Sequence, residues 1–253
     1  MLKLRVIPSL LLKDGRMIKT VNFDNYRDVG DPVTCAKVYD SQGADELIFL
    51  DITASVENRS TLLDIVTKTA EQCFMPLAVG GGIKTVDDIR KLLRSGADKV
   101  TINTAAVENP DLIREAAEVF GNSTIVVSID VRKNSCDCYE VFTHRAQKAT
   151  GLDPVEWAKK AEKLGAGEIL ITAVDCEGRM EGYDLQLTKA VAEAVGIPVI
   201  AHGGAGKLQD LADVLAFGKA SAVAAASIFH FTDQSPIKAH SFLESAGFCV
   251  RTI

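Results

Sequence analysis

Short, almost uninterrupted hydrophobic runs recur along the chain, and segments with helical spacing separate them. The runs are rich in β-branched residues, as is typical of strands buried on both faces of a parallel sheet. Eight such runs alternating with helices in 253 residues predict a (β/α)8 TIM barrel, formed as a single domain over residues 1–253. The predicted strands are Arg5–Leu12, Glu46–Ile52, Leu77–Val79, Lys99–Asn103, Ile125–Asp130, Glu168–Val174, Pro198–His202 and Ser221–Ala226.

Three of the intervening segments have the apolar periodicity of amphipathic helices: Thr85–Ser95, Asp153–Leu164 and Leu187–Val195. The first two begin at Thr85 and Asp153, whose side-chain oxygens can accept hydrogen bonds from the amides of a first helical turn. Glycines follow both segments and predict where these helices stop.

The two halves of the sequence resemble each other. Ala44–Leu50 is similar to Ala166–Thr172, and Pro76–Gly82 is similar to Pro198–Gly204, both at a separation of 122 residues. We therefore expect a half-barrel repeat, in which functional positions occur in pairs.

Glycine clusters follow the third and seventh runs, at Gly80–Gly82 and at Gly203, Gly204 and Gly206. Glycine lets backbone amides approach phosphate oxygens closely, and a TIM barrel carries its chemistry at these carboxyl ends of its strands. Small polar residues (Asn103, Thr104 and Ser227) end the fourth and eighth runs. The pattern predicts two phosphate sites for an elongated ligand, or one phosphate site and the remnant of a second site that no longer binds. Tight turns without any ligand are the alternative.

Two carboxylates at the same ends, Asp51 and Asp130, are candidate acid–base groups. Asp130 closes an apolar run, and partial burial would raise its pKa toward the range useful in catalysis. A role as a helix cap or loop anchor is the alternative. The half-repeat aligns Ser128 with Ser9 and Asp130 with Leu11, so that a leucine occupies the place of a second carboxylate.

Charged residues begin four of the runs, at Arg5, Glu46, Lys99 and Glu168. If they point inward, they form a ring that plugs the floor of the barrel, and such a ring is costly unless it serves a purpose. If they point outward, they are ordinary solvated charges.

Composition removes several classes of function. The net charge of −6 argues against nonspecific nucleic-acid binding, and no stretch approaches the length of a membrane span. Pro8 and Ser9 interrupt the first apolar run, which argues against a signal peptide. The six cysteines include no CxxC pair, and Cys136 and Cys138 have no companion ligands for zinc. We expect a reduced, cytoplasmic protein that needs no metal or other cofactor.

The chain resembles the cyclase subunit of imidazole glycerol phosphate synthase over essentially its whole length. The segments that carry the resemblance are Lys13–Arg16, Gly30–Pro32, Leu50–Ser55, Val79–Ile83, Gly96–Val100, Ile102–Pro110, Gly165–Leu170 and Gly203–Lys207. The resemblance implies a lyase of histidine biosynthesis. A glutaminase subunit would dock on its floor and release ammonia into the barrel. At the mouth, ammonia would react with a doubly phosphorylated ribulosyl aminoimidazole carboxamide. The products would be imidazole glycerol phosphate and aminoimidazole carboxamide ribonucleotide.

The resemblance also implies roles for individual residues. Asp130 matches one of the family's two catalytic aspartates, and Lys19 matches the lysine of its mobile loop. One phosphate site would consist of Gly82, Asn103 and Thr104, and the other of Gly178, Gly204 and Ser227. The charged gate over the ammonia passage would consist of Arg5, Glu46, Lys99 and Glu168.

Three positions depart from the family pattern. Leu11 replaces the second catalytic aspartate, Glu177 stands where an aspartate is usual, and His202 stands where a serine is usual. Both of the latter would alter the second phosphate site. An aliphatic side chain cannot carry a proton, and losing one of two acid–base groups commonly costs about two to four orders of magnitude in rate.

The Pro8–Lys13 segment resembles a divergent branch associated with surface-polysaccharide biosynthesis, in which barrel and glutaminase supply ammonia to a separate sugar amidotransferase. Leu11 and the complete gate agree with that resemblance. A working cyclase of histidine biosynthesis is the first alternative, and a non-catalytic phosphate-binding module is the second. The related isomerase barrel needs no gate, and the Asn103–Pro110 segment resembles it less.

Overall fold

The eight hydrophobic runs form eight parallel strands that close into a barrel, in a computed structural model that describes residues 3–52 and 63–252. Closure comes from pairing of the last strand with the first, which places Ile7 opposite Ala224. The barrel strands, in their order around it, are β1 (Arg5–Lys13), β4 (Leu47–Asp51), β5 (Leu77–Gly80), β6 (Lys99–Ile102), β7 (Ile125–Lys133), β10 (Glu168–Ala173), β11 (Val199–His202) and β12 (Ala222–Ala225). The predicted TIM barrel is confirmed.

The strand boundaries agree with the predicted ones to within one residue at every end except the carboxyl end of β7. That strand runs on from Asp130 to Lys133, because these residues pair with a further antiparallel strand, β8 (Tyr139–Thr143). A hydrophobic run marks only the part of a strand that is buried on both faces.

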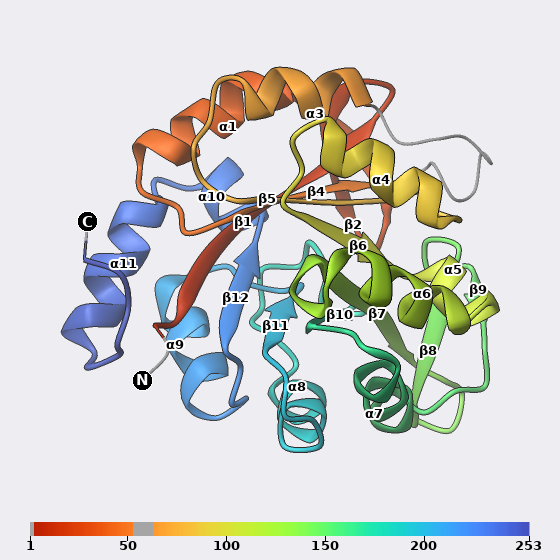
Figure 1. Cartoon of the computed structure of the whole chain (residues 1–253). Helices are drawn as coiled ribbons and strands as arrows, with labels where there is room; N and C mark the ends of the chain where they lie inside the picture. Colours follow the sequence, from red (N-terminus) through yellow and green to blue (C-terminus); the bar gives the residue numbers. More distant parts are fainter. Residues whose placement is uncertain (1–2, 53–62, 253) are drawn as a thin grey trace.

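Helices surround the strands (Figure 1). They are α1 (Pro32–Ser41), α3 (Leu63–Ala70), α4 (Val86–Arg94), α5 (Thr104–Glu108), α6 (Asp111–Phe120), α7 (Pro154–Leu164), α8 (Leu185–Ala192), α9 (Leu208–Ala216), α10 (Ser227–Phe231) and α11 (Pro236–Ser245), with a 3-10 turn at Asn122–Thr124. In the described part of the chain, none of these helices is long and apolar enough to cross a membrane.

The predicted helix boundaries are confirmed for α4 and α7. Thr85 and Asp153 are the N-caps, and Gly165 ends α7 in the left-handed conformation. The prediction for α8 was wrong by two residues at its start and three at its end, because the cap is Asp184, whose carboxylate accepts from the amide of Leu187. Apolar periodicity alone missed that polar start signal.

Alternation along the strands divides the hydrophobic core into two layers. Inside the barrel lie Ile7, Ile48, Ala78, Val126, Leu170, Ile200, Ala222 and Ala224. Between strands and helices lies a larger layer that includes Val6, Leu10, Phe49 and Val79. On β1, the odd-numbered residues therefore face the barrel axis and the even-numbered ones face the helices.

The half-repeat is visible in detail. β1 and β7 are both nine residues long, and each pairs with an antiparallel strand that follows it. Asp88 accepts hydrogen bonds from the amides of Lys84 and Thr85, and Asp210, 122 residues later, accepts from those of Gly206 and Lys207. The two halves thus start α4 and α9 with the same pair of bonds.

Two hairpins at the mouth are absent from the predicted element list. The first consists of β2 (Arg16–Val21) and β3 (Asp24–Gly30), and the second of β8 and β9 (Lys148–Ala149). Asp14 and Gly15 form the two-residue turn between β1 and β2, both with positive φ, and Asp-Gly is a strong hairpin signal. The Asp14–Gly15 dipeptide could therefore have predicted the first hairpin from the sequence.

Candidate functional site

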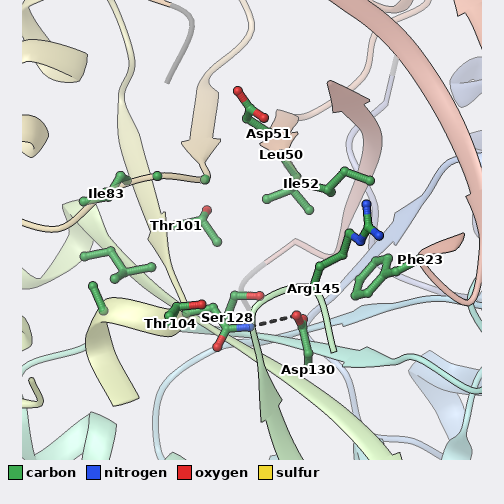
Figure 2. A pocket seen from close by; sticks show the side chains of 15 residues that line it. Phe23, Leu50, Asp51, Ile52, Ile83, Thr101, Thr104, Ser128, Asp130 and Arg145 are labelled. Atoms are coloured by element: carbon green, nitrogen blue, oxygen red, sulfur yellow. Dashed lines mark hydrogen bonds between the residues drawn. The ribbon is translucent and has the colours of Figure 1, made fainter. Parts of the chain in front are cut away.

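A pocket opens at the carboxyl ends of β4, β5, β6 and β7 (Figure 2). Its lining includes Gly82, Asn103 and Thr104, which were expected to bind one phosphate, together with Asp51 and Asp130. The structure thus brings five of the predicted site residues to one cavity. Figure 2 shows Asp51 and Asp130 on opposite sides of it.

Asp130 is buried near the end of β7 on the inner face of the barrel, and only 8% of it is exposed. Its carboxylate accepts a hydrogen bond of 2.8 Å from the side-chain amide of Asn103 (Figure 2). Burial raises the pKa of Asp130 to about 7, against the hydrogen bonds from Asn103, Thr172 and Ser128, and the nearby charge of Glu177 acts in the same direction as burial. Near neutral pH this carboxyl can therefore both give and take a proton.

Leu11 lies on the inner face of β1, on the odd-numbered register that also carries Ile7. β1 and β7 are four strands apart in a closed ring of eight, so that Leu11 and Asp130 stand on opposite walls of the mouth. The Leu11 side chain is only 1% exposed. The structure therefore puts an inert hydrocarbon across from the acid–base candidate.

The first predicted phosphate site is lined by backbone that only glycine tolerates. Gly81 and Gly82 both have positive φ, and a Cβ on Gly81 would approach the carbonyl oxygen of Asp51 to 2.1 Å. Thr104 begins α5, and its hydroxyl accepts a hydrogen bond from the amide of His144. Close packing of backbone thus accounts for Gly81, and its positive φ favours glycine at Gly82. The phosphate role of this site stays a prediction.

The second predicted phosphate site is packed tightly against its surroundings. A Cβ on Gly178 would lie 2.3 Å from the carbonyl oxygen of Thr20, and one on Gly204 would lie 2.0 Å from that of Gly182. Ser227 begins α10 and is buried. The β2–β3 hairpin covers this side of the mouth.

Lys19 links the β2–β3 hairpin to the loop after β10. Its ammonium group forms a buried ion pair with Glu177, in the loop after β10. The same carboxylate accepts hydrogen bonds from the Thr20 hydroxyl and the Phe23 amide, both at 3.0 Å. The two positions that were singled out separately, Lys19 and Glu177, are thus direct partners.

His202 lies at the end of β11, where its Nδ1 is 3.1 Å from the hydroxyl of Thr172. Burial lowers the pKa of His202 to about 3, and the charge of Lys19 lowers it further. The imidazole is therefore neutral near pH 7 and supplies no positive charge for a phosphate.

The four charged residues of the opposite rim point inward and form a closed ring. Arg5 contacts Glu46 at 2.7 Å and Glu168 at 3.1 Å, and Lys99 contacts the same two carboxylates at 2.8 and 3.0 Å. Burial lowers the pKa of Arg5, but the charges of Glu168 and Glu46 outweigh it and raise this pKa. Of the two alternatives, the structure therefore shows the inward ring that plugs the floor of the barrel. Its function as a gate stays a prediction.

The sequence reasoning missed two groups at the mouth. Phe23, at the tip of the β2–β3 hairpin, packs with Ala146 and Val174 over the opening. Arg145, in the turn between β8 and β9, lines the pocket. Both residues have positive φ, a backbone conformation that cannot be predicted from the sequence for phenylalanine or arginine.

Among the described residues, no group of three or more histidine, cysteine or acidic side chains could hold a metal ion. Cys136 and Cys138 lie in the exposed turn between β7 and β8, and all six cysteines are free thiols.

A family model with the description "Histidine biosynthesis protein" matches residues 5–235. The match includes all eight barrel strands and every residue of the mouth and floor described above. The chain belongs to this family. Members of the histidine biosynthesis protein family are typically enzymes, either isomerases or cyclases. The chain therefore has an enzyme-type barrel, and the family match agrees in general with a cyclase-type subunit. Its membership of the polysaccharide-associated branch stays a prediction.

Proposed function

We propose that this chain is the ammonia-receiving barrel of a glutamine amidotransferase, and that it serves an acceptor other than the ribulosyl substrate of histidine biosynthesis. The observation that carries the proposal is the combination of Leu11 with the complete floor ring. At the mouth, Leu11 replaces one of the two aspartates that transfer protons in the cyclases. At the floor, all four charged residues expected of an ammonia gate are present.

The interior of the barrel is compatible with passage of a small neutral molecule. Above the floor ring, the inner face of the barrel carries a layer of apolar side chains that includes the small side chains of Ala78, Ala222 and Ala224. Neutral ammonia crosses such a layer at little cost, whereas ammonium would lose its hydration there. In this proposal the ring admits ammonia, the apolar layer keeps it uncharged, and a sugar amidotransferase consumes it.

The floor also offers a surface for a glutaminase subunit. Phe74, in the loop before β5, is 95% exposed, and Phe217, in the loop before β12, is 64% exposed. Both loops lead into the amino ends of strands and so lie on the rim that carries the ring. Exposed aromatic side chains of this kind are typical anchors of protein interfaces.

A working cyclase is the second candidate, and Asp130 favours it. Its pKa of about 7 suits a general acid–base group, and its bond to Asn103 holds it in place. In that case a water molecule or a neighbouring group would replace the missing aspartate.

The deciding experiment is a cyclase assay with the ribulosyl aminoimidazole carboxamide substrate and excess ammonium salt at alkaline pH, which makes a glutaminase unnecessary. We expect no turnover by the unmodified chain and measurable turnover by Leu11→Asp. Leu11→Asn is the matched control, since asparagine is similar in shape to aspartate but cannot transfer a proton. Robust turnover by the unmodified chain would overturn the proposal in favour of the histidine-pathway cyclase.

A second experiment tests the ammonia route with a glutaminase subunit in a reconstituted complex. Lys99→Met removes one of the two cations that hold Glu46 and Glu168. We expect altered ammonia delivery per glutamine hydrolysed. Unchanged delivery would argue against passage through the floor ring.

A further inference from the structure

Three polar side chains lie side by side on adjacent strands of the barrel. Thr172 of β10 is the register partner of Asp130 on β7 at one side and of His202 on β11 at the other. All three continue the inward-facing positions of their strands, so their side chains share the inner face of the mouth. Neighbouring strands are about 4.8 Å apart, and the row from Asp130 to His202 therefore spans about 10 Å.

The row is buried and is joined by hydrogen bonds. The exposed fractions of Asp130, Thr172 and His202 are 8%, 1% and 4%. The Thr172 hydroxyl lies 3.1 Å from the Nδ1 of His202. It also bonds to the carboxyl group of Asp130, where this bond opposes the rise in the pKa of Asp130 that burial causes. One hydroxyl group thus connects two titratable side chains.

The two bonds of Thr172 are coupled, because its hydroxyl has a single proton. When Asp130 is ionised, Thr172 donates to the carboxylate and accepts from Nδ1–H of His202, which leaves Nε2 as an acceptor. When Asp130 is protonated, its O–H donates to Thr172, Thr172 donates to Nδ1, and the imidazole proton is on Nε2. The tautomer of His202 therefore depends on the protonation of Asp130.

Two charged side chains act on the ends of the row, and they are the partners of the buried ion pair between Lys19 and Glu177. Burial lowers the pKa of His202 to about 3, and the charge of Lys19 acts in the same direction. Burial raises the pKa of Asp130 to about 7, and the charge of Glu177 acts in the same direction. Near neutral pH, Asp130 therefore gains or loses a proton while the imidazole stays neutral and changes only its tautomer.

We propose that Asp130, Thr172 and His202 form a proton relay, which brings the acid–base function of Asp130 to the β11 side of the mouth. When a ligand N–H or O–H group gives its proton to Nε2 of His202, the Nδ1 proton moves to Thr172 and the Thr172 proton moves to Asp130. The reverse sequence returns one proton to the ligand. Among the described residues, none bonds to this Nε2, which is therefore left for a ligand.

The relay carries one proton and does not supply a second proton carrier in place of Leu11. The expected lack of cyclase turnover is therefore unchanged. The inference rests on the register of three strands and not on the ammonia role. It depends on His202, which is one of the three departures from the family pattern.

The test is NMR spectroscopy of the intact chain with ¹⁵N-labelled histidine, recorded from about pH 5 to about pH 9. The chain contains four histidines, and His202→Gln assigns the signals of His202 by their loss. We expect Nε2 to be the protonated ring nitrogen at the acidic end and Nδ1 at the alkaline end, with the midpoint at the pKa of Asp130, about 7. At no pH in this range should both nitrogens carry protons.

Thr172→Val is the informative variant, since valine has nearly the shape of threonine but no hydroxyl. We expect the tautomer of His202 to stop following the pH, while the carboxyl ¹³C signal of Asp130 still titrates. Thr172→Ser is the matched control, because it keeps the hydroxyl and should keep the change of tautomer. Asp130→Asn breaks the relay at its other end, since an amide has no proton to exchange, and should hold His202 in one tautomer throughout.

The proposal is overturned if His202 of the unmodified chain keeps one tautomer across the pH range, or becomes doubly protonated within it. It is also overturned if the change of tautomer persists in Thr172→Val or in Asp130→Asn. None of these outcomes bears on the ammonia role, which the cyclase and glutaminase assays test separately.

Discussion

Lys19 of β2 and Glu177 of the loop after β10 form an ion pair whose side chains are 5% and 3% exposed. The two residues are far apart in the sequence and meet because the β2–β3 hairpin folds back over the mouth. The pair, with the bonds from Thr20 and Phe23, closes the side of the mouth that carries Gly178 and Ser227. Opening that side requires the buried pair between Lys19 and Glu177 to break.

Glu177→Gln should release the hairpin. It leaves the Lys19 ammonium buried without a counter-charge, and breaking a buried pair in this way typically costs about 3–5 kcal/mol. We expect a lower free energy of unfolding in urea and faster hydrogen exchange at the β2–β3 amides.

Asp28→Asn is the control for this prediction. It breaks the pair between Arg16 and Asp28 in the same hairpin, where both side chains are more than half exposed, so that the loss should stay below about 1 kcal/mol. Equal stability of Glu177→Gln and the unmodified chain would show that Lys19 escapes to solvent and that the buried pair does not restrain the hairpin.

Asp130 should make the stability depend on pH. Its pKa in the folded chain is about 7, above its ordinary value of 3.8. The stabilisation is therefore fully present below about pH 4 and is lost as the pH rises through 7. Asp130→Asn should match the unmodified chain at pH 4 and exceed it by up to about 4 kcal/mol at pH 8.

Urea unfolding at both pH values measures this difference. Asp175→Asn is the control, at a side chain that is 49% exposed. A constant difference between Asp130→Asn and the unmodified chain across the pH range would show that Asp130 is ionised throughout.

His240 should produce a second pH dependence, at the floor end of the barrel. Its Nε2 lies 2.7 Å from a carboxylate oxygen of Asp45, and its Nδ1 lies 2.9 Å from the carbonyl oxygen of Pro236. Both ring nitrogens face acceptors, so the imidazole is doubly protonated. Burial lowers the pKa of His240, but the bond to Asp45 and its charge outweigh burial and raise it.

The stabilisation by His240 is therefore fully present below its ordinary pKa of 6.5 and is lost as the pH rises through the higher pKa of the folded chain. We expect His240→Gln to lose about 1.5–3 kcal/mol at pH 6, and progressively less at higher pH. Thermal unfolding across the pH range measures this loss, with His144→Gln as control. A loss that does not change with pH would contradict a charged His240.

Phe74→Ser tests the floor surface. Because the side chain is 95% exposed, we expect thermal unfolding to change by no more than about 0.5 kcal/mol. Binding of a glutaminase subunit should weaken at least about tenfold if Phe74 is an interface anchor. Phe231→Ser, at an exposed phenylalanine that follows the carboxyl end of β12, should leave binding unchanged. Equal binding by both variants would remove Phe74 from the interface.

The sequence by itself determined the barrel, because strands buried on both faces need continuous apolar runs whatever their neighbours are. It also determined the starts of α4 and α7, since Thr85 and Asp153 cap their helices through bonds within four residues. The half-repeat paired Leu11 with Asp130, and the closed strand order puts them on opposite walls.

Only the tertiary structure decided which groups meet. Lys19 faces Glu177, and Arg5 bridges Glu46 and Glu168, because barrel closure brings together residues far apart in the chain. The sequence placed the charges of the floor ring at the starts of their strands but left open whether they point inward, and no local pattern pairs Lys19 with Glu177. The left-handed turn at Arg145 was equally invisible, since arginine has no preference for that conformation and adopts it where contacts such as those of His144 with Thr104 and of Ala146 with Phe23 impose it.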